Sequence, residues 1–433
     1  MSQAADRTAV TPLRAVAVAW LITSVYYFYQ YAMRSAPAVM VPEMSTAFGL
    51  TPVGIASLVG LFYYAYAPFS LVAGVAMDQL GPRKVVPVGA AAVAVGALLF
   101  STGDPNLASI GRFLQGAGGV FALIGAVYIA TTHFPASKAA TLIGATQMFG
   151  MAGGSAGQFV VGPAIGGGLA WDQFWWLMGL VGLPIALLLA LYIPSRQPAP
   201  TPASPGRNWL KDAGSAIWTV FRNPQSIICG LISGLLFIPT TIFDMVWGVR
   251  FLQEGHGMPY DVAVLRSAAV PFGWIIGCPL LGWISDRIGR RKPVIIGGAA
   301  VLLAAMTMGL YGPPGVLPPF TIALVAGIAS GAAMIPYTVV KEANRPEHSG
   351  SATGVINFVN FSFSALLGPL FAARLMRISG GDDRALGDYQ ATFMPMLIGV
   401  GLAILLTLLL RETGPRPRKT NEAPPLGAGL PAE

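Results

Sequence analysis

Charged side chains are scarce in this sequence. Asp, Glu, Lys and Arg together form 10% of its 433 residues, whereas soluble chains carry about 25%. So few charges cannot cover a soluble surface, which argues against a soluble enzyme, a nucleic-acid-binding protein or a secreted disulfide-rich domain. Hydrophobic residues form 54% and are interspersed with 53 glycines and 35 prolines. The mean hydropathy is +0.64, and this combination is typical of packed membrane helices.

Several signatures of catalytic and ATP-driven proteins are also missing. No phosphate-binding G-x-x-x-x-G-K-[ST] loop occurs, which argues against ATP-driven transport by this chain. No cluster has metal-ligand spacing and no Ser-His-Asp arrangement stands out, so we expect no enzyme activity, metal or cofactor. None of the 3 histidines falls in the middle of an apolar stretch, which argues against a histidine proton relay. Cys229 and Cys278 lie within apolar sequence and are interpreted as small core residues.

Long apolar stretches dominate the chain. A helix that spans a bilayer needs about 20 mostly apolar residues. The sequence contains twelve such stretches and therefore predicts an all-α membrane protein with twelve transmembrane helices. The predicted spans are 14–42, 53–76, 85–102, 107–133, 139–168, 173–193, 226–252, 262–285, 293–311, 317–340, 350–376 and 389–410.

The longest polar segment, residues 194–225, is rich in proline and divides the spans into six and six. We interpret it as a cytoplasmic linker that carries a short interfacial helix at 208–221. The expected units are an N-terminal cytoplasmic tail (1–13), a six-helix bundle (14–193), the linker (194–225), a second six-helix bundle (226–411) and a disordered cytoplasmic tail (412–433). If both ends are cytoplasmic, most of the 26 Lys and Arg residues fall on the inner side of the membrane. We therefore expect a multi-pass protein of the bacterial inner membrane with both termini inside.

An internal repeat relates the two halves. The loop after the second span and the loop after the eighth span share glycine, aspartate, glycine and a basic cluster at equal spacing, 208 residues apart. These segments are 74–84 and 282–292. A second repeat is the Gly-Pro pair at 162–163 and 368–369, 206 residues apart. Two pseudo-symmetric bundles of common ancestry explain both repeats.

The charged residues of these loops are candidate gating residues. An acid flanked by fixed bases can clamp neighbouring helices and hold one side of a membrane bundle closed, while the glycines allow close contact between helices. Alternatively, the bases only set the topology. The candidates are Asp78, Arg83, Lys84, Asp286, Arg287, Arg290 and Arg291, with Lys341 and Glu342 as a further gating pair at the inner end of the tenth span.

The repeated loops strongly resemble the signature loop of the major facilitator superfamily. A second family motif, R-x-x-Q-G-x-G, is matched from Arg112 to Gly118 in the fourth span. The resemblance extends from about residue 14 to 411. It implies two six-helix bundles that rock around a site at the middle of the membrane, in a protein that is usually a monomer.

The first span contains candidate substrate-binding residues. Tyr27, Gln30, Tyr31 and Arg34 follow helical spacing and form one stripe. A charge inside the bilayer is costly and tends to face a cavity. Phenolic hydroxyls and a guanidinium group suit a carboxylate or a phosphate. Alternatively, Arg34 extends outward to the membrane surface or pairs with Glu43.

The segment 34–42 also resembles the first helix of organophosphate and anion:cation symporters, in which an arginine eight residues before a proline holds the substrate anion. The organophosphate branch has a second arginine in the seventh span, where this chain has none at 240–244. A monoanionic or carboxylate substrate is therefore favoured over a phosphate. Uncharged polar residues of other spans could complete the cavity, although each alone commonly joins helices. They are Tyr63, Gln147, Gln158, Tyr337, Asn357 and Asn360.

Asp244 and Arg112 are candidate proton-coupling residues. Asp244 is an acid within the seventh span, where burial favours its protonated form. The family resemblance implies that Arg112 tunes a nearby acid. Alternatively, Asp244 is a structural partner of Arg250 or of the backbone, and Arg112 packs helices together.

Three functions remain open. The first is secondary active transport of a small organic anion by alternating access, coupled to protons as a symporter. The second is a proton-coupled antiporter that exports amphipathic compounds or a carboxylate-rich chelator, which the many aromatic and Met residues permit. The segment 162–167 resembles part of an antiporter motif and leaves the direction of transport open. The third is a membrane sensor that does not transport. The expected partners are a small organic anion, protons and the lipid bilayer, and nucleic acid is not expected.

Overall fold

The computed structural model describes residues 13–50, 52–194, 209–312, 319–380 and 385–414. Within these ranges every regular element is a helix. The predicted all-α membrane fold is confirmed, and each of the twelve predicted spans coincides with a helix or with a run of consecutive helices. Residues 1–12 and 415–433 of the predicted tails, and residues 195–208 of the predicted linker, lie outside the described residues.

The N-terminal bundle consists of six membrane-spanning units. They are α1 (Leu13–Ser35), α3 (Pro52–Leu80), α4 (Pro82–Phe100), α5 (Pro105–His133), α6 (Ala139–Phe159) with α7 (Val161–Gly166), and α8 (Trp171–Tyr192). A turn of 3₁₀-helix at Ala36–Val39 and α2 (Val41–Phe48) join α1 to α3. The first predicted span therefore ends earlier than expected, because Pro37 lacks the amide hydrogen that would continue the helix.

The C-terminal bundle has the same number of units, but two of them are interrupted. They are α10 (Pro224–Ile238) with η3 (Pro239–Gly248) and η4 (Phe251–Gly255), α11 (Tyr260–Ile288), α12 (Lys292–Tyr311), α13 (Pro319–Ser330) with α14 (Ile335–Glu342), α15 (Ser349–Ser379) and α16 (Leu386–Leu409). Segments η3 and η4 are π-helical, and η3 starts at Pro239, which cannot donate the hydrogen bond of an α-helix. Such wide helical turns are frequent at functional sites.

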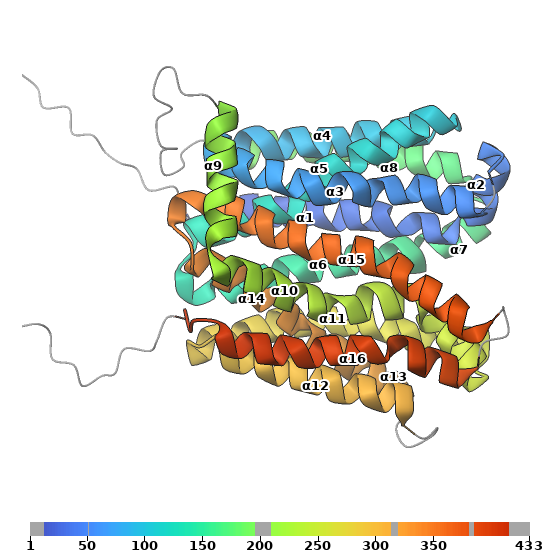
Figure 1. Cartoon of the computed structure of the whole chain (residues 1–433). Coiled ribbons are helices and arrows are strands. Elements are labelled where there is room, and N and C mark those ends of the chain that lie inside the picture. The colour runs from blue at the N-terminus through green and yellow to red at the C-terminus, as the bar shows by residue number, and fades with distance from the viewer. Residues whose placement is uncertain (1–12, 51, 195–208, 313–318, 381–384, 415–433) are drawn as a thin grey trace, which may run out of the picture.

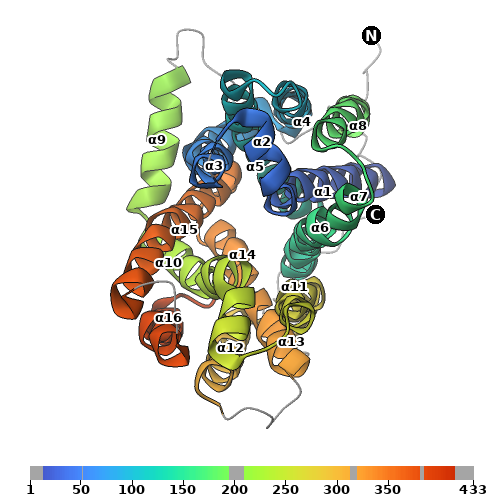
Figure 2. The same ribbon diagram turned by 90° about the vertical axis from the view of Figure 1, so that its right-hand side faces the viewer.

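The two bundles lie side by side with parallel long axes (Figures 1 and 2). Helices α3 and α15 pack against each other across the interface, as do α6 and α11. Helix α9 (Trp209–Arg222) covers almost the same residues as the expected interfacial helix. It runs across the long helices at one end of the molecule (Figure 1) and contacts α3 of one bundle and α10 and α15 of the other.

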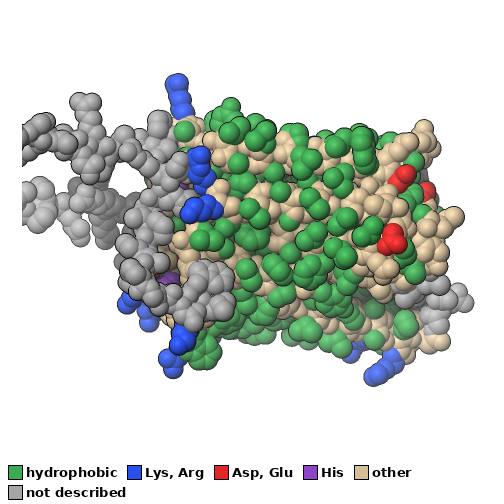
Figure 3. All heavy atoms as spheres, turned by 90° about the horizontal axis from the view of Figure 1, so that it is seen from above, with side chains coloured by type: hydrophobic (Ala, Val, Ile, Leu, Met, Phe, Trp, Pro, Cys, Tyr) green, Lys and Arg blue, Asp and Glu red, His purple; other side chains and the backbone are tan. Residues whose placement is uncertain are grey.

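Hydrophobic side chains cover the middle of the molecule, and most of the visible Lys and Arg gather at one end, while a smaller basic group and the visible Asp and Glu lie at the other (Figure 3). We call the first of these the basic end, after its exposed residues Arg83, Lys84, Lys138, Arg287 and Arg290. Of the described helices, 10 are long and apolar enough to cross a membrane. The remaining two predicted spans, α1 and the α6–α7 unit, are joined by polar contacts such as Trp20 Nε1 to Thr146 Oγ1 at 3.0 Å. The chain is a multi-pass integral membrane protein.

Candidate functional site

A cavity of about 450 Å³ lies between the two bundles. It is formed by the last turns of α1 and α6, the first half of α3, η3 and the second half of α15. All of these segments belong to the half of the molecule away from the basic end, because α3 ends and α15 begins at the basic end. The cavity therefore lies on the far side of the bundle centre from the basic end. Its size is in the range of small-molecule sites.

Arg34 reaches this cavity from α1. Its Nε donates a hydrogen bond to the Tyr63 hydroxyl at 3.1 Å. Its Nη1 is buried and has no hydrogen-bond partner among the described residues. The ion pairs among the described residues do not include Arg34, so it neither pairs with Glu43 nor extends to the membrane surface.

Aromatic rings surround the Arg34 guanidinium group. Its Cζ lies 4.5 Å from the ring centre of Tyr31 and 4.9 Å from that of Tyr63. The rings of Phe361 and Phe62 follow at 5.1 and 5.8 Å. Each such contact contributes about 0.5–2 kcal/mol. The rings hold the guanidinium group in place without neutralising its charge, which leaves Nη1 available to an anion.

The structure divides the predicted substrate-binding residues into two groups. Tyr31, Arg34, Tyr63 and Gln158 line the cavity. The other predicted substrate-binding residues are buried and do not line the cavity, and most of them form hydrogen bonds with one another. These are Tyr27, Gln30, Gln147, Tyr337, Asn357 and Asn360.

The deeper polar residues form the floor beneath the cavity. The Tyr337 hydroxyl donates to Asn357 Oδ1 at 2.9 Å, and Asn357 Nδ2 donates across the bundle interface to Ser70 Oγ at 2.8 Å. Asn360 Nδ2 donates to the Tyr337 hydroxyl at 3.3 Å. Tyr27 donates to Gln147 Oε1 at 3.0 Å, which joins α1 to α6. These buried hydrogen bonds lie between the cavity and the basic end, and one of them joins the two bundles.

Gln30 differs from its neighbours on the predicted stripe. Its side chain lies against Gly119 of α5, where an added Cβ would be 3.0 Å from Gln30 Oε1. Both polar atoms of its amide group are buried and lack a partner among the described residues. Such a group is costly to leave unpaired. The Gln30 amide group could therefore gain a hydrogen-bond partner if the packing of the helices changes.

Arg112 is fully buried inside the N-terminal bundle. Its Nη1 donates to Gln115 Oε1 at 2.7 Å and its Nη2 donates to the Val59 carbonyl at 3.3 Å. Its Cζ lies 5.4 Å from the ring centre of Phe62, the same ring that lies near Arg34. The structure therefore brings Arg112 close to the cation of the cavity, whereas Asp244 lies in the other bundle.

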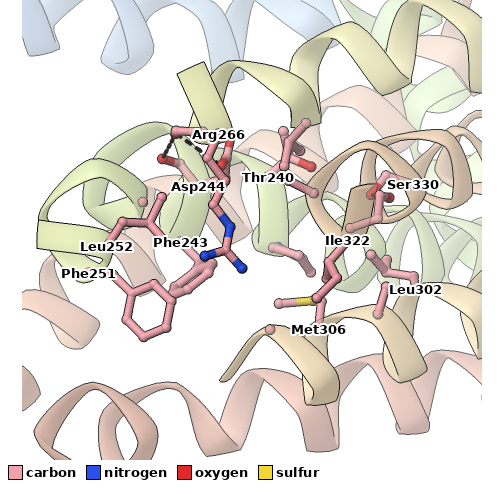
Figure 4. Close-up of a pocket in the computed structure, with 18 residues that line it drawn as sticks. Thr240, Phe243, Asp244, Phe251, Leu252, Arg266, Leu302, Met306, Ile322 and Ser330 are labelled. Atoms are coloured by element: carbon pink, nitrogen blue, oxygen red, sulfur yellow. Dashed lines mark hydrogen bonds between the residues drawn. The ribbon is translucent and has the colours of Figure 1, made fainter. Parts of the chain in front are cut away.

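Asp244 lies in a second, smaller pocket within the C-terminal bundle (Figure 4). Its Oδ1 accepts a hydrogen bond from Ser267 Oγ of α11 at 3.1 Å. Leu302, Met306 and Ile322 form an apolar wall, and the guanidinium group of Arg266 points into the same space (Figure 4). The carboxyl group is thus buried in a largely apolar space that it shares with one cation, Arg266.

Segment η3 separates the Asp244 pocket from the central cavity. Thr241, Ile242 and Met245 face the cavity. Thr240, Phe243 and Asp244 face the pocket. The central cavity and the Asp244 pocket therefore share η3 as a wall. A movement of η3 would alter both of them.

Asp78 and Asp286 close the basic end by bonding across the two bundles. Asp78, near the end of α3, accepts hydrogen bonds from the Gly350 amide at 2.6 Å and from the Ser351 amide at 2.7 Å, at the start of α15. Asp286, near the end of α11, accepts from the Thr141 amide at 2.8 Å, at the start of α6. Each carboxylate also accepts a hydrogen bond from the side-chain hydroxyl of Ser351 or Thr141. The free amides and the positive dipole end of a helix favour a carboxylate at this place.

Arg291 extends the second of these contacts. Its Nη1 lies 2.6 Å from Asp286 Oδ1, and its Nη2 lies 2.8 Å from Glu342 Oε1. Burial alone would lower the pKa of Arg291, but its hydrogen bonds with Glu342 and Asp286 outweigh that effect and raise the pKa. Arg291 therefore stays charged and joins α11, α12 and α14.

Lys341 and Glu342 point to different partners and do not form the expected pair. The Lys341 ammonium group donates across the bundle interface to the Val127 carbonyl of α5 at 3.2 Å and to the Thr131 hydroxyl. Glu342 instead bonds to Arg291 within its own bundle. Lys341 is thus a third contact between the bundles at the basic end.

The remaining predicted gating residues lie at the surface of the basic end. Arg83 donates to the Ile193 carbonyl at 3.0 Å within the N-terminal bundle. Arg287 lies over the ring of Trp283, and Arg290 pairs with Glu412 at 3.8 Å. Lys84 is exposed. Contacts between the bundles at the basic end are thus made by Asp78, Asp286 and Lys341, and not by these surface bases.

Sequence reasoning missed the helix starts that receive these acids. Ser351 and Thr141 are the partners of Asp78 and Asp286, and they stand 210 residues apart, close to the loop repeat of 208. A small hydroxyl residue two positions into the fifth and eleventh spans was therefore a detectable signal. Phe62 and Ser267 were also missed, and nothing in the sequence distinguishes them from other helix residues.

Known proteins resemble this chain over nearly its full length. A family model described as Major Facilitator Superfamily matches residues 23–369. The membrane sensor protein UhpC of Salmonella typhimurium is 23% identical over 436 residues, which cover 93% of this chain and 92% of that protein. The probable sulfoacetate transporter SauU of Cupriavidus necator is 23% identical over 397 residues, which cover 87% of this chain and 89% of that protein.

The fold has solved counterparts. The transporter FucP, in its outward conformation, superposes with a TM-score of 0.72 at 15% identity, over 92% of this chain and 99% of that chain. FucP is described as a fucose:proton symporter of E. coli. The family model matches most of the chain. The two bundles and the cavity between them agree with that match. The chain belongs to the Major Facilitator Superfamily, a family of membrane transporters rather than enzymes.

Proposed function

We propose that this protein is a secondary active transporter that carries a small organic anion across the membrane by alternating access, coupled to protons. The observation that carries the proposal is Arg34, whose Nη1 has no partner among the described residues although it is buried at the edge of the central cavity. A buried cation without a counter-ion is costly. An anionic substrate would supply the missing partner, and the hydrogen bonds that a guanidinium group donates to an anion are among the stronger ones in proteins.

The charge distribution supports a cytoplasmic basic end, because Lys and Arg are retained on the cytoplasmic side of membrane proteins. The central cavity then belongs to the outer half of the protein, and the contacts of Asp78, Asp286 and Lys341 close the inner side. Breaking these contacts and closing the cavity at the other end would present Arg34 to the cytoplasm. Such rocking of two bundles around a fixed site is the mechanism by which repeated membrane bundles alternate access.

Proton coupling is assigned to Asp244. Its carboxyl group lies in an apolar pocket on the other side of η3 from the substrate cavity. Gain or loss of a proton there changes the charge next to η3, whose residues Thr241 and Met245 face the cavity. Arg112 acts from the N-terminal bundle by adding positive potential near Arg34 through their shared neighbour Phe62.

Uptake of radiolabelled anions into proteoliposomes tests the anion site. We expect Arg34→Ala to abolish uptake and Arg34→Lys to retain little of it, because the lysine ammonium group cannot reproduce the guanidinium fork. Arg377→Ala is the matched control, because Arg377 is exposed near the end of α15 and is not among the residues that line the cavity. Unchanged uptake by the Arg34→Ala protein would reject the anion site.

The same vesicles test proton coupling. An inwardly acidic or alkaline gradient should change the extent of accumulation by the unmodified protein. Asp244→Asn should remove this response while exchange of labelled for unlabelled substrate continues. Gradient-driven accumulation that survives Asp244→Asn would show that the proton binds elsewhere.

A membrane sensor is the second candidate function, because the relative UhpC carries that description and matches 93% of this chain. A sensor would bind an anion through Arg34 without moving it. Binding measured by thermal shift, together with absent uptake and absent exchange under every gradient, would favour the sensor.

A further inference from the structure

The two walls of the central cavity differ in polarity. On the side of the N-terminal bundle the wall combines apolar residues, such as Val41, Ile55 and Val59, with polar side chains. The polar ones are Tyr31, Arg34, Ser35, Tyr63, Tyr64 and Gln158. On the side of the C-terminal bundle the described lining residues are Thr241, Ile242, Met245, Ala365, Gly368 and Pro369. The hydroxyl group of Thr241 donates to the Phe237 carbonyl of its own helix at 3.1 Å. The described side chains of this second wall therefore offer apolar surface and no free hydrogen-bond donor.

The cavity also holds a single cation. Of the described lining residues, only Arg34 is charged at neutral pH. Arg112 does not line the cavity and is fully buried behind it, near Phe62. One anionic group can be neutralised by Arg34, whereas a second would lose its hydration without gaining a cation. The charge pattern thus favours a substrate with one negative charge.

The position of Arg34 orients such a substrate. Its guanidinium group belongs to the polar wall, and Phe361 of α15 lies 5.1 Å from it on the other side of the interface. For an anionic head bound to Arg34 and near Tyr63, the opposite wall with Met245 and Pro369 is the apolar surface available to the rest of the molecule. Polar groups on that part of the substrate would lose water and find no partner.

Resting on the proposed function, we infer that the substrate class is a monoanionic carboxylate or sulfonate with an apolar ring or branched chain as its body. The anionic head binds Arg34 on the wall of the N-terminal bundle. The apolar body packs against η3 and α15 on the wall of the C-terminal bundle. Sugars and polyhydroxylated acids fit poorly because the second wall leaves their hydroxyl groups unpaired, and dianions fit poorly because only one cation is present.

Matched probes test each part of this inference by calorimetry on the purified full chain in lipid nanodiscs. Cyclohexanecarboxylate has the predicted chemistry. Quinate keeps the ring and the carboxylate but adds hydroxyl groups, isophthalate and sulfoacetate add a second charge, and cyclohexylmethanol removes the charge. We expect cyclohexanecarboxylate to bind at least about tenfold more tightly than each of the others, since one unpaired polar group costs on the order of that factor.

Two variants separate the inference from the proposed function. Arg34→Ala should remove the binding of every anion, and Arg34→Lys provides a second test if the alanine variant does not fold. Met245→Gln should narrow the preference for cyclohexanecarboxylate over quinate by about tenfold, because it adds a donor to the apolar wall. If quinate, isophthalate or sulfoacetate binds most tightly and depends on Arg34, the inference is overturned and the anion site survives. If no anion binds, or binding is independent of Arg34, both fail.

Discussion

The Asp78 carboxylate of the N-terminal bundle accepts hydrogen bonds from the backbone amide and the hydroxyl group of Ser351, at 2.7 and 2.6 Å, at the start of a helix in the C-terminal bundle. Asp286 makes the equivalent contacts with Thr141 in the opposite direction. The repeated loop of each half therefore caps a helix of the other half. Because these bonds exist only while the bundles meet at the basic end, they stabilise one state of the transport cycle and not the other.

Removing one cap should open the basic end. Asp78→Ala loses charge-assisted bonds to a helix start, worth about 1–3 kcal/mol. We expect a larger distance between spin labels at Lys138→Cys and Glu347→Cys, which lie on different bundles at the basic end, measured by pulsed electron resonance in a cysteine-free background.

Asp104→Ala is the control for this experiment. Asp104 also caps a helix, with its Oδ1 2.9 Å from the Asn106 amide, but that helix is its own α5. Its loss should cost a similar free energy of about 0.5–2 kcal/mol and leave the label distance unchanged. An equal change in both variants would mean that general destabilisation, and not the contact between bundles, sets the distance.

Lys341→Met should stabilise the closed basic end. The ammonium group is buried against a carbonyl and a hydroxyl group of α5, and these partners together with the attraction of the nearby Asp78 carboxylate repay only part of its lost hydration. We expect a higher thermal unfolding midpoint and slower transport, because the closed state becomes harder to leave. Thr131→Val removes one partner but keeps the charge, so it should lower the midpoint. A lower midpoint for Lys341→Met would contradict this account.

Gly74→Ala should prevent closure of the basic end. A Cβ at Gly74 would lie 2.6 Å from the Gly350 carbonyl oxygen of α15, closer than atoms can approach. We expect transport to be lost and the label distance across the basic end to increase. Gly297→Ala is the matched control, because a Cβ there meets nothing within 4 Å; it should be neutral or stabilise α12 by about 0.5–1 kcal/mol.

Arg112→Gln should weaken anion binding without touching the cavity. Arg112 and Arg34 lie 5.4 and 5.8 Å from the centre of the same Phe62 ring, so each adds to the positive potential at the other. Loss of one charge should raise the dissociation constant of an anion severalfold and leave binding of a neutral probe unchanged. Tighter anion binding in Arg112→Gln would show that Arg112 only repels Arg34.

Local patterns were sufficient for the framework of the molecule. Each of the twelve spans predicted from hydropathy coincides with a helix or a run of helices, and 10 of the described helices are long and apolar enough to cross a membrane. The loop repeat at 74–84 and 282–292 predicted two related halves, and the charge pattern singled out Arg34. The exact course of the seventh span could not be predicted, because π-helical turns after Pro239 depend on packing against α11 and α15.

Sequence alone predicted where the apolar helices lie, that the chain has two related halves, and which few charges enter the apolar stretches, because each of these follows from the composition of single segments or from a repeat between two of them. Only the tertiary structure decided that Asp78 caps a helix of the other bundle, that Lys341 and Glu342 separate, and that Arg34 and Asp244 face different spaces on either side of η3. These relationships depend on how closely two helices approach and how each is rotated about its axis, and those quantities are set by contacts between residues far apart in the chain.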